Sequence, residues 1–170
     1  MMIFGMAVAA AVGIGIAVTG PSQDEPRSRV VQANALSQLP LVGTWSLDVS
    51  RIPPDERPRR VTLDFRVSAD HIWTGRSEII AGDGSRQHAE ATGPADGTPV
   101  PVTGNMDFAD EVSMRQPAPN TLVLTFTKGG NPVSTRVYTI EEDRSSMKET
   151  IIWAGNVTPR MVTTYFERVR

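Results

Sequence analysis

The sequence contains no cysteine, and this absence removes several kinds of chemistry at once. A disulfide framework, a thiol nucleophile, a thiolate metal site and a lipid-modified N-terminal cysteine are all excluded. Stability must therefore come from the hydrophobic core alone, which a domain of about 130 residues can provide.

The chain also lacks an excess of charge of either sign. Its 17 Lys and Arg side chains nearly balance 19 Asp and Glu side chains, and the formal net charge is −2. The nearest approach to a basic cluster is Arg57, Arg59 and Arg60, and it lies beside Asp55 and Glu56. Because binding to nucleic acid depends on a basic patch, we expect no nucleic-acid partner.

No familiar catalytic or metal-binding pattern is visible in the sequence. Neither a Gly-x-Ser-x-Gly motif nor a nucleotide-binding glycine loop occurs. His71 and His88 fall on either side of an expected turn, where Glu78 or Glu90 could complete a metal site. Two partly exposed strand histidines are the simpler interpretation. We therefore predict no catalytic residue, no metal, no cofactor and a protein that is not an enzyme.

A long apolar segment stands at the start of the chain, in residues 1–20. Its length is typical of a signal peptide or of a membrane anchor. Gly13 and Gly15 make it only mildly hydrophobic, which favours a cleaved signal, although no basic residue precedes Arg27. We expect an exported protein, periplasmic or secreted. An uncleaved anchor in the inner membrane is the alternative, and the membrane would then be contacted only through this segment.

Residues 21–40 are polar, contain Pro21, Pro26 and Pro40, and predict a flexible linker. Residues 41–170 are expected to form a single domain. The 14 Gly and 13 Pro of the chain indicate frequent turns between short strands. Gly129-Gly130 is the clearest hairpin signal, and Asp96-Gly97 also predicts a turn. Pro99 and Pro101 indicate an edge strand or a bulge.

Alternating apolar and polar residues run through most of this domain. The pattern is strongest in residues 61–67 and 121–128, where an apolar side chain occupies every second position. The other expected strands span residues 41–47, 71–80, 85–92, 100–103, 111–116, 133–141, 147–153 and 160–169. Short strands at this spacing predict an all-β, antiparallel up-and-down β-barrel of about 8–10 strands, after an N-terminal apolar helix or leader.

The first of these strands begins with Gly43-Thr44-Trp45, which resembles the Gly-x-Trp signature of lipocalins. In that superfamily a basic residue of the last strand packs over the tryptophan and closes one end of the barrel, and Arg168 has the matching place. Residues 96–104, 109–115, 120–128, 133–136 and 165–168 are similar to small exported bacterial lipocalin-like proteins of unknown function. The resemblance covers about residues 41–168 and implies a lipocalin-like barrel.

Alternation also suggests which polar side chains face the interior of the barrel. Glu149 and Trp153 share one face of their strand, and a lumen-facing Glu149 is a buried acid that needs a partner. Arg76 or Arg136, both on other expected strands, supplies that partner or meets a carboxylate of a ligand. A shift of register by one residue would instead leave all three charged groups in solvent.

The chain has only ten aromatic residues, and eight of them are expected to fill the barrel: Trp45, Phe65, Trp73, Phe126, Tyr138, Trp153, Tyr165 and Phe166. Many small side chains beside them predict an incompletely filled lumen with a small apolar cavity. We predict binding of a small hydrophobic or amphipathic ligand. The alternative is a structural or protein-interaction β-barrel of the cell envelope, without a small-molecule ligand. The predicted ligand-binding residues are Phe65, Arg76, Phe126, Arg136, Glu149 and Trp153.

Overall fold

The computed structural model describes residues 39–154 and 160–170 of the chain. The predicted leader and nearly all of the predicted linker lie outside the described residues. Leu39 and Pro40, assigned above to the linker, contact the barrel: Leu39 packs against the core and its carbonyl accepts a hydrogen bond from the Val42 N–H at 3.0 Å. Within the described ranges, no helix is long and apolar enough to cross a membrane.

A single antiparallel sheet accounts for nearly all of the described structure, which confirms the predicted all-β barrel. Eleven strands are present in the described residues, rather than the expected eight to ten, together with one turn of 3-10 helix, η1 (Val49–Arg51). The strands are β1 (Gly43–Leu47), β2 (Arg60–Val67), β3 (Ile72–Ile80), β4 (Arg86–Pro94), β5 (Asp96–Pro101), β6 (Thr103–Gly104), β7 (Glu111–Ala118), β8 (Thr121–Lys128), β9 (Asn131–Ile140), β10 (Ser146–Trp153) and β11 (Arg160–Arg168).

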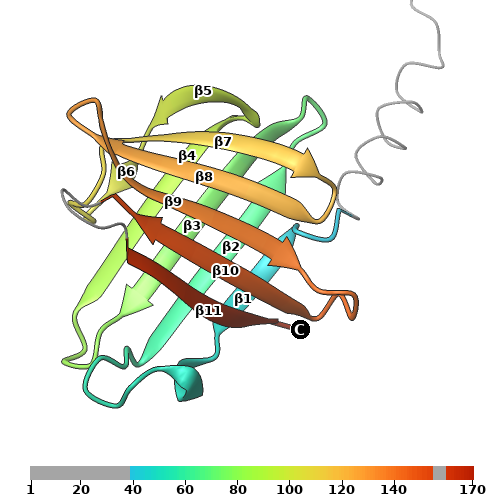
Figure 1. Cartoon of the computed structure of the whole chain (residues 1–170). Helices are drawn as coiled ribbons and strands as arrows, with labels where there is room; N and C mark the ends of the chain where they lie inside the picture. Colours follow the sequence, from blue (N-terminus) through green and yellow to red (C-terminus); the bar gives the residue numbers. More distant parts are fainter. Residues whose placement is uncertain (1–38, 155–159) are drawn as a thin grey trace, which may run out of the picture.

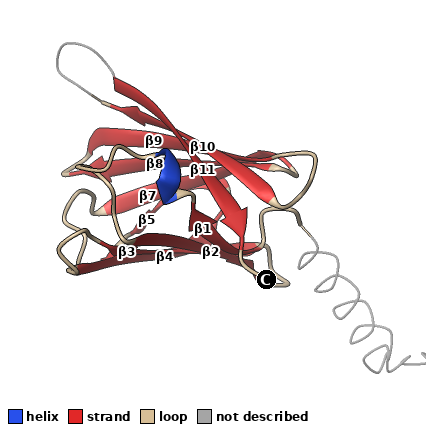
Figure 2. Ribbon diagram, turned by 90° about the horizontal axis from the view of Figure 1, so that it is seen from below, coloured by secondary structure: helices blue, strands red, loops and turns tan. Residues whose placement is uncertain are grey.

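The strands follow an up-and-down order, β5-β7-β8-β9-β10-β11-β1-β2-β3-β4-β6. The first and last strands of the domain are neighbours, since Trp45 of β1 lies opposite Arg168 of β11. Strands β7–β11 form one wall of the barrel and β1–β4 form the facing wall (Figures 1 and 2). The hydrophobic core lies between these two walls.

Residues 96–104 connect the two ends of the sheet. They were expected to contain one strand but form two, β5 and β6, which accounts for the eleventh strand. The first of these, β5, pairs with β7, and the second, β6, pairs with β4. The predicted turn at Asp96-Gly97 is present, because the pairs Ala89–Gly104 and Glu90–Thr103 are centred on these two residues and Gly97 has a φ of +95°. Both residues also belong to β5, where Asp96 lies opposite Arg115 of β7. Asp96 accepts a hydrogen bond from the Thr98 N–H at 2.8 Å, and this local bond accompanies a bulge between Asp96 and Pro99. The two prolines therefore lie on an edge strand, as predicted.

One end of the barrel is filled by closely packed side chains. Trp45 is fully buried, and its indole Nε1–H donates to the Leu41 carbonyl at 3.0 Å. The Arg168 guanidinium lies 4.1 Å from the centre of the Trp45 ring and donates to the backbone carbonyls of Val42, at 2.8 Å, and Pro40. The contact expected from the lipocalin resemblance is thus present, and stacking on the indole adds about 1–2 kcal/mol when partly desolvated.

Gly43 is required by the close approach of this arginine. Its φ is +130°, and a Cβ atom at this position would lie 2.6 Å from Arg168 Nη1. We expect Gly43→Ala to lower the free energy of unfolding by about 2–3 kcal/mol, because the backbone strain and the displaced arginine add together. Urea denaturation measures this loss.

The matched control for Gly43→Ala is Gly129→Ala. Gly129 also has a positive φ, +57°, but no atom lies within 4 Å of its added Cβ. Because only the left-handed backbone is strained there, a loss of about 1 kcal/mol is expected. Equal losses in the two variants would contradict the role given to the Gly43–Arg168 contact.

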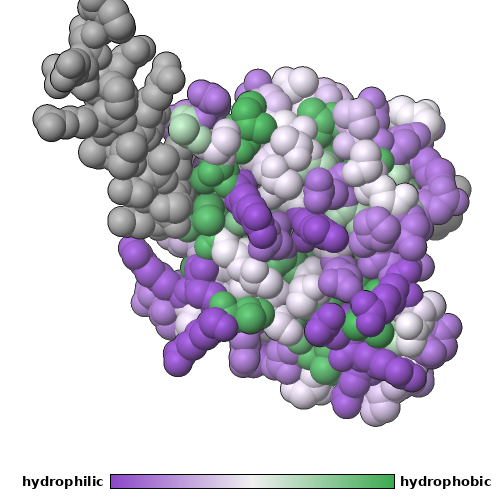
Figure 3. Space-filling model, turned by 180° about the vertical axis from the view of Figure 1, so that it is seen from behind, coloured by the Kyte–Doolittle hydropathy of each residue, from purple (hydrophilic) through white to green (hydrophobic). Residues whose placement is uncertain are grey.

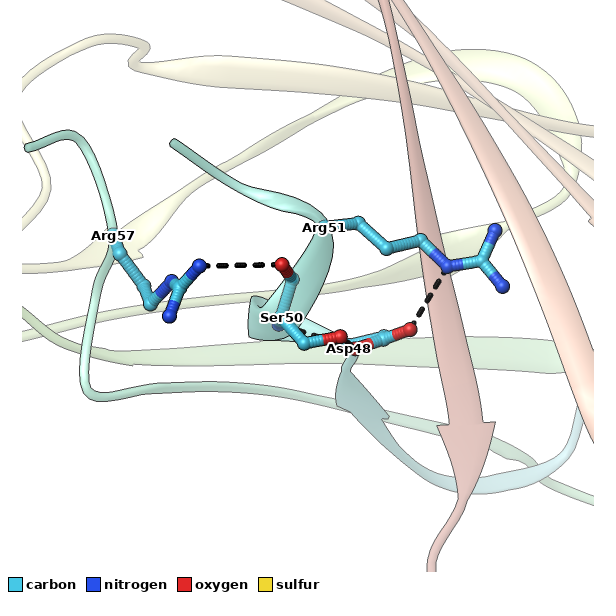
Figure 4. A network of polar contacts seen from close by, with 4 residues as sticks. All are labelled: Asp48, Ser50, Arg51 and Arg57. Atoms are coloured by element: carbon cyan, nitrogen blue, oxygen red, sulfur yellow. Dashed lines mark hydrogen bonds and ion pairs between the residues drawn. The ribbon is translucent and has the colours of Figure 1, made fainter. Parts of the chain in front are cut away.

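The opposite end of β1 runs into a loop built around η1 (Figure 4). Asp48 accepts hydrogen bonds from the Ser50 N–H at 3.1 Å and from Arg51 Nε at 2.9 Å, while Arg57 donates to the Ser50 carbonyl at 3.2 Å. The bonds from Ser50 and Arg51 lower the pKa of Asp48 below its ordinary value. This loop is therefore held by its own polar contacts.

Tyr165 does not fill the barrel, contrary to expectation. It is exposed on the outer face of β11, where the Arg51 guanidinium lies 4.2 Å from its ring centre. Its neighbour Phe166 is buried instead. The cause is the period of two along a strand, which sends adjacent side chains to opposite faces.

Candidate functional site

A cavity of about 630 Å³ occupies the half of the barrel that Trp45 does not fill. Its size is within the range of known small-molecule sites. Most of its wall is apolar, with Leu63 and Phe65 from β2, Ile79 from β3, and Leu124 and Phe126 from β8. Inward positions of nearly every strand contribute, because every second residue of a barrel strand faces the lumen.

One carboxylate, Glu149, is buried in the wall of this cavity, with 3% of its surface exposed. Its Oε1 accepts hydrogen bonds from the Tyr138 hydroxyl at 2.8 Å and from Arg136 Nη1 at 3.2 Å. Its Oε2 accepts one from the Thr164 hydroxyl at 2.7 Å. Strand register explains the group: Glu149 of β10 lies opposite Tyr138 of β9 and Thr164 of β11.

The protonation states in this group follow from burial and from the neighbouring charges. Burial raises the pKa of Tyr138 well above its ordinary value, and the Glu149 carboxylate raises it further, so the hydroxyl keeps its proton. Burial alone would lower the pKa of Arg136, but the neighbouring Glu149 carboxylate raises it, and the net direction is upward. Arg136 is therefore a charged guanidinium and Tyr138 a neutral hydroxyl that donates to Glu149.

Aromatic rings surround the guanidinium of Arg136. Its central carbon lies 5.4 Å from the ring centres of both Phe108 and Phe126, and 5.8 Å from that of Trp153. Phe108 belongs to the loop between β6 and β7, and its ring centre is 5.1 Å from that of Phe126. These rings provide cation–π attraction and limit the access of water to the charge.

Two buried polar atoms of β9 have no hydrogen-bond partner among the described residues. They are Nε of Arg136 and the hydroxyl oxygen of Ser134. Ser134 and Arg136 are two residues apart and so lie on the same face of the strand. Buried polar atoms are nearly always hydrogen-bonded, and Arg136, unlike Ser134, lines the cavity, so its unpaired Nε is the donor at which a ligand acceptor is expected.

Five of the six residues predicted to bind a ligand have side chains on the inner wall. Phe65, Phe126, Arg136, Glu149 and Trp153 all line the cavity, and Arg136 is the partner that the buried Glu149 requires. Their contact with a ligand stays a prediction.

Arg76 is the exception, although it also borders the cavity. Its side chain is exposed, and its register opposite Asp64 and Glu90 places it in a charged row on the outer face of β2–β4. Trp73 and Gly75 occupy the inward positions of β3, because Trp73 is buried and Gly75 faces the Phe65 ring.

Seen from behind, the surface of the molecule is mainly hydrophilic, with small separate apolar areas (Figure 3).

Three further residues of the site were not among those predicted. Tyr138 and Thr164 could have been found from alternation, since Tyr138 is two residues beyond Arg136 and Thr164 is two before Phe166. Phe108 lies in a loop without periodicity, so the sequence carries no signal for its position.

The two histidines do not approach each other. His88 of β4 lies opposite Glu78, whereas His71 precedes Ile72, which lies opposite Pro94. His88 and Pro94 are six residues apart along β4, which corresponds to about 20 Å, so the two histidines lie near opposite ends of this strand pair. In the part of the chain that the structure describes, no three His, Asp or Glu side chains are grouped to hold a metal ion.

Comparison with models of known protein families gives no match, and a search of curated proteins finds no similar sequence.

Proposed function

We propose that this protein is an exported lipocalin-like barrel that binds a small hydrophobic or amphipathic molecule. The observation that carries the proposal is the cavity of about 630 Å³ inside the barrel, whose walls are mostly apolar and hold the hydrogen-bonded cluster of Arg136, Tyr138, Glu149 and Thr164. Apolar surface moved from water into such a cavity contributes about 25 cal/mol per Å² to binding. The apolar leader and the Gly43–Trp45 resemblance support the assignment to exported lipocalin-like proteins.

The alternative, a structural or protein-interaction barrel, has weaker support. Its best evidence is the apolar pair of Ile152 and Met161, which lie opposite each other on β10 and β11 and are 38% and 70% exposed. Two side chains are far smaller than the surface that a stable protein interface buries. A filled core would also be expected for this role, and the cavity argues against it.

A fluorescence titration with the neutral dye N-phenyl-1-naphthylamine tests the proposal. We expect saturable enhancement with a dissociation constant in the micromolar range, as is usual for a ligand of this size. Ala91→Phe places a ring in the cavity and should weaken binding at least about tenfold.

The matched control is Thr92→Phe, the same ring one residue along β4 on the exposed face. It should leave dye binding unchanged while keeping the added hydrophobicity. The absence of saturable binding by the unmodified protein, or equal weakening in both variants, would contradict a ligand site in the barrel.

A further inference from the structure

We propose that the cavity selects an uncharged ligand with a carbonyl-type hydrogen-bond acceptor over a carboxylate, and that Glu149 is the residue that sets this preference. The ligand class is thus an apolar ketone, ester or amide. The inference rests on the proposed function and makes it specific.

The demand for an acceptor comes from the unpaired donors of β9. Nε of Arg136 can only donate a hydrogen bond, and the Ser134 hydroxyl can donate one as well. Both atoms are buried and lack partners within the described ranges, and Arg136, unlike Ser134, lines the cavity, so its Nε is the donor that calls for a ligand acceptor. A buried donor without a partner is unfavourable, so a ligand that brings an acceptor oxygen removes a penalty present in the unliganded protein.

The preference for an uncharged acceptor comes from the state of Glu149. Its two oxygens already receive hydrogen bonds from Arg136, Tyr138 and Thr164, and its charge balances that of Arg136. A ligand carboxylate would add a second negative charge beside Glu149 in a poorly solvated space. Burying a charge without its own counterion is strongly unfavourable.

Among the residues that the structure describes, no other charged group at the cavity changes this balance. Asp107 borders the cavity, but its side chain is fully exposed and paired with Lys128 at 2.7 Å. Arg76 and Glu90 belong to the outer face, where they lie opposite each other on β3 and β4. Arg136 and Glu149 are therefore the charges that a bound ligand meets in the interior.

Two probes of nearly equal size and shape test the inference: 2-acetylnaphthalene, an uncharged ketone, and 2-naphthoate, its anionic counterpart. Their affinities are measured by displacement of N-phenyl-1-naphthylamine from the full chain at pH 7.5. We expect the ketone to bind at least about tenfold more tightly than the anion. Equal affinity, or tighter binding of 2-naphthoate, would overturn the inference and leave the proposed function standing.

Glu149→Gln is the decisive variant, because it removes the negative charge and keeps a side chain of the same shape. The charge of Arg136 is then uncompensated, so the ratio of ketone to anion affinity should fall by at least about tenfold. Glu111→Gln, the same change at an exposed position of β7, should leave the ratio as it is. An unchanged ratio in a folded Glu149→Gln protein would overturn the role of Glu149.

The outcomes for the two proposals are distinct. If the dye itself fails to bind, the ligand-binding function is contradicted, and the charge preference falls with it. If the dye binds and the ketone is not preferred, only the charge preference is contradicted. The comparison of probes on the unmodified protein decides the preference even if Glu149→Gln does not fold.

Discussion

Replacing Trp45 with alanine is expected to lower the free energy of unfolding by about 3–5 kcal/mol. The side chain is fully buried at the filled end of the barrel, and it supports both Arg168 and the first strand. The substitution removes one of the two tryptophans of the buried core and leaves a void that the rigid barrel closes only in part. It also leaves the Arg168 guanidinium without the ring on which it stacks.

Equilibrium unfolding in urea measures this loss, and Trp153→Ala is the matched control. Trp153 is only half-buried and stands at the far end of β10, beside the cavity. A cavity is already present there, so we expect a loss of about 1–2 kcal/mol. A loss below about 1 kcal/mol for Trp45→Ala would show that this tryptophan does not close the barrel.

Replacing Arg136 with methionine is expected to lower the free energy of unfolding by about 2–4 kcal/mol. The change leaves the nearly inaccessible Glu149 carboxylate without its cation, and loss of one partner of a buried pair is costly. The largest losses seen when one partner of a buried ion pair is removed are not expected here. The reason is that 20% of the Arg136 side chain is exposed, and that the Tyr138 and Thr164 hydroxyls still donate to Glu149.

The double variant Arg136→Met with Glu149→Gln separates the charge from the packing. A glutamine keeps the hydrogen bonds to Tyr138 and Thr164 and removes the unpaired charge. We expect it to restore at least half of the stability lost in Arg136→Met, measured by the same urea titration. If the second change lowers stability further, the cost of Arg136→Met is not that of an uncompensated charge.

The strands with a clear period of two were predictable from the sequence. The alternation in residues 61–67 places Leu63 and Phe65 inside, where both are buried. The Gly129-Gly130 turn was equally legible, since its two residues have φ of 57° and 76°, a combination that glycine adopts at little cost. The local residue pattern is sufficient to predict a strand and its turn where the period of two and the turn residues indicate the same structure.

Other parts of the barrel depend on contacts that the sequence does not encode locally. Residues 96–104 are rich in proline and glycine and have no alternation, so the division into β5 and β6 became visible only through their different partners. The sequence does not show which face of β3 points inward. Gly75 and Ser77 on one face are small or polar, and they are not clearly more apolar than Thr74 and Arg76 on the other. The register against β2 decides it, by placing Gly75 opposite Phe65.

The most direct test of the central claim is native mass spectrometry of the protein isolated from the cells that produce it. A ligand-binding barrel predicts a non-covalent adduct of a small uncharged molecule, which is lost on denaturation and is absent from the Ala91→Phe variant prepared in the same way. The mass of the released molecule gives its chemical class. A single unliganded mass for both proteins would contradict a ligand-binding role and favour a structural or interaction role for the barrel.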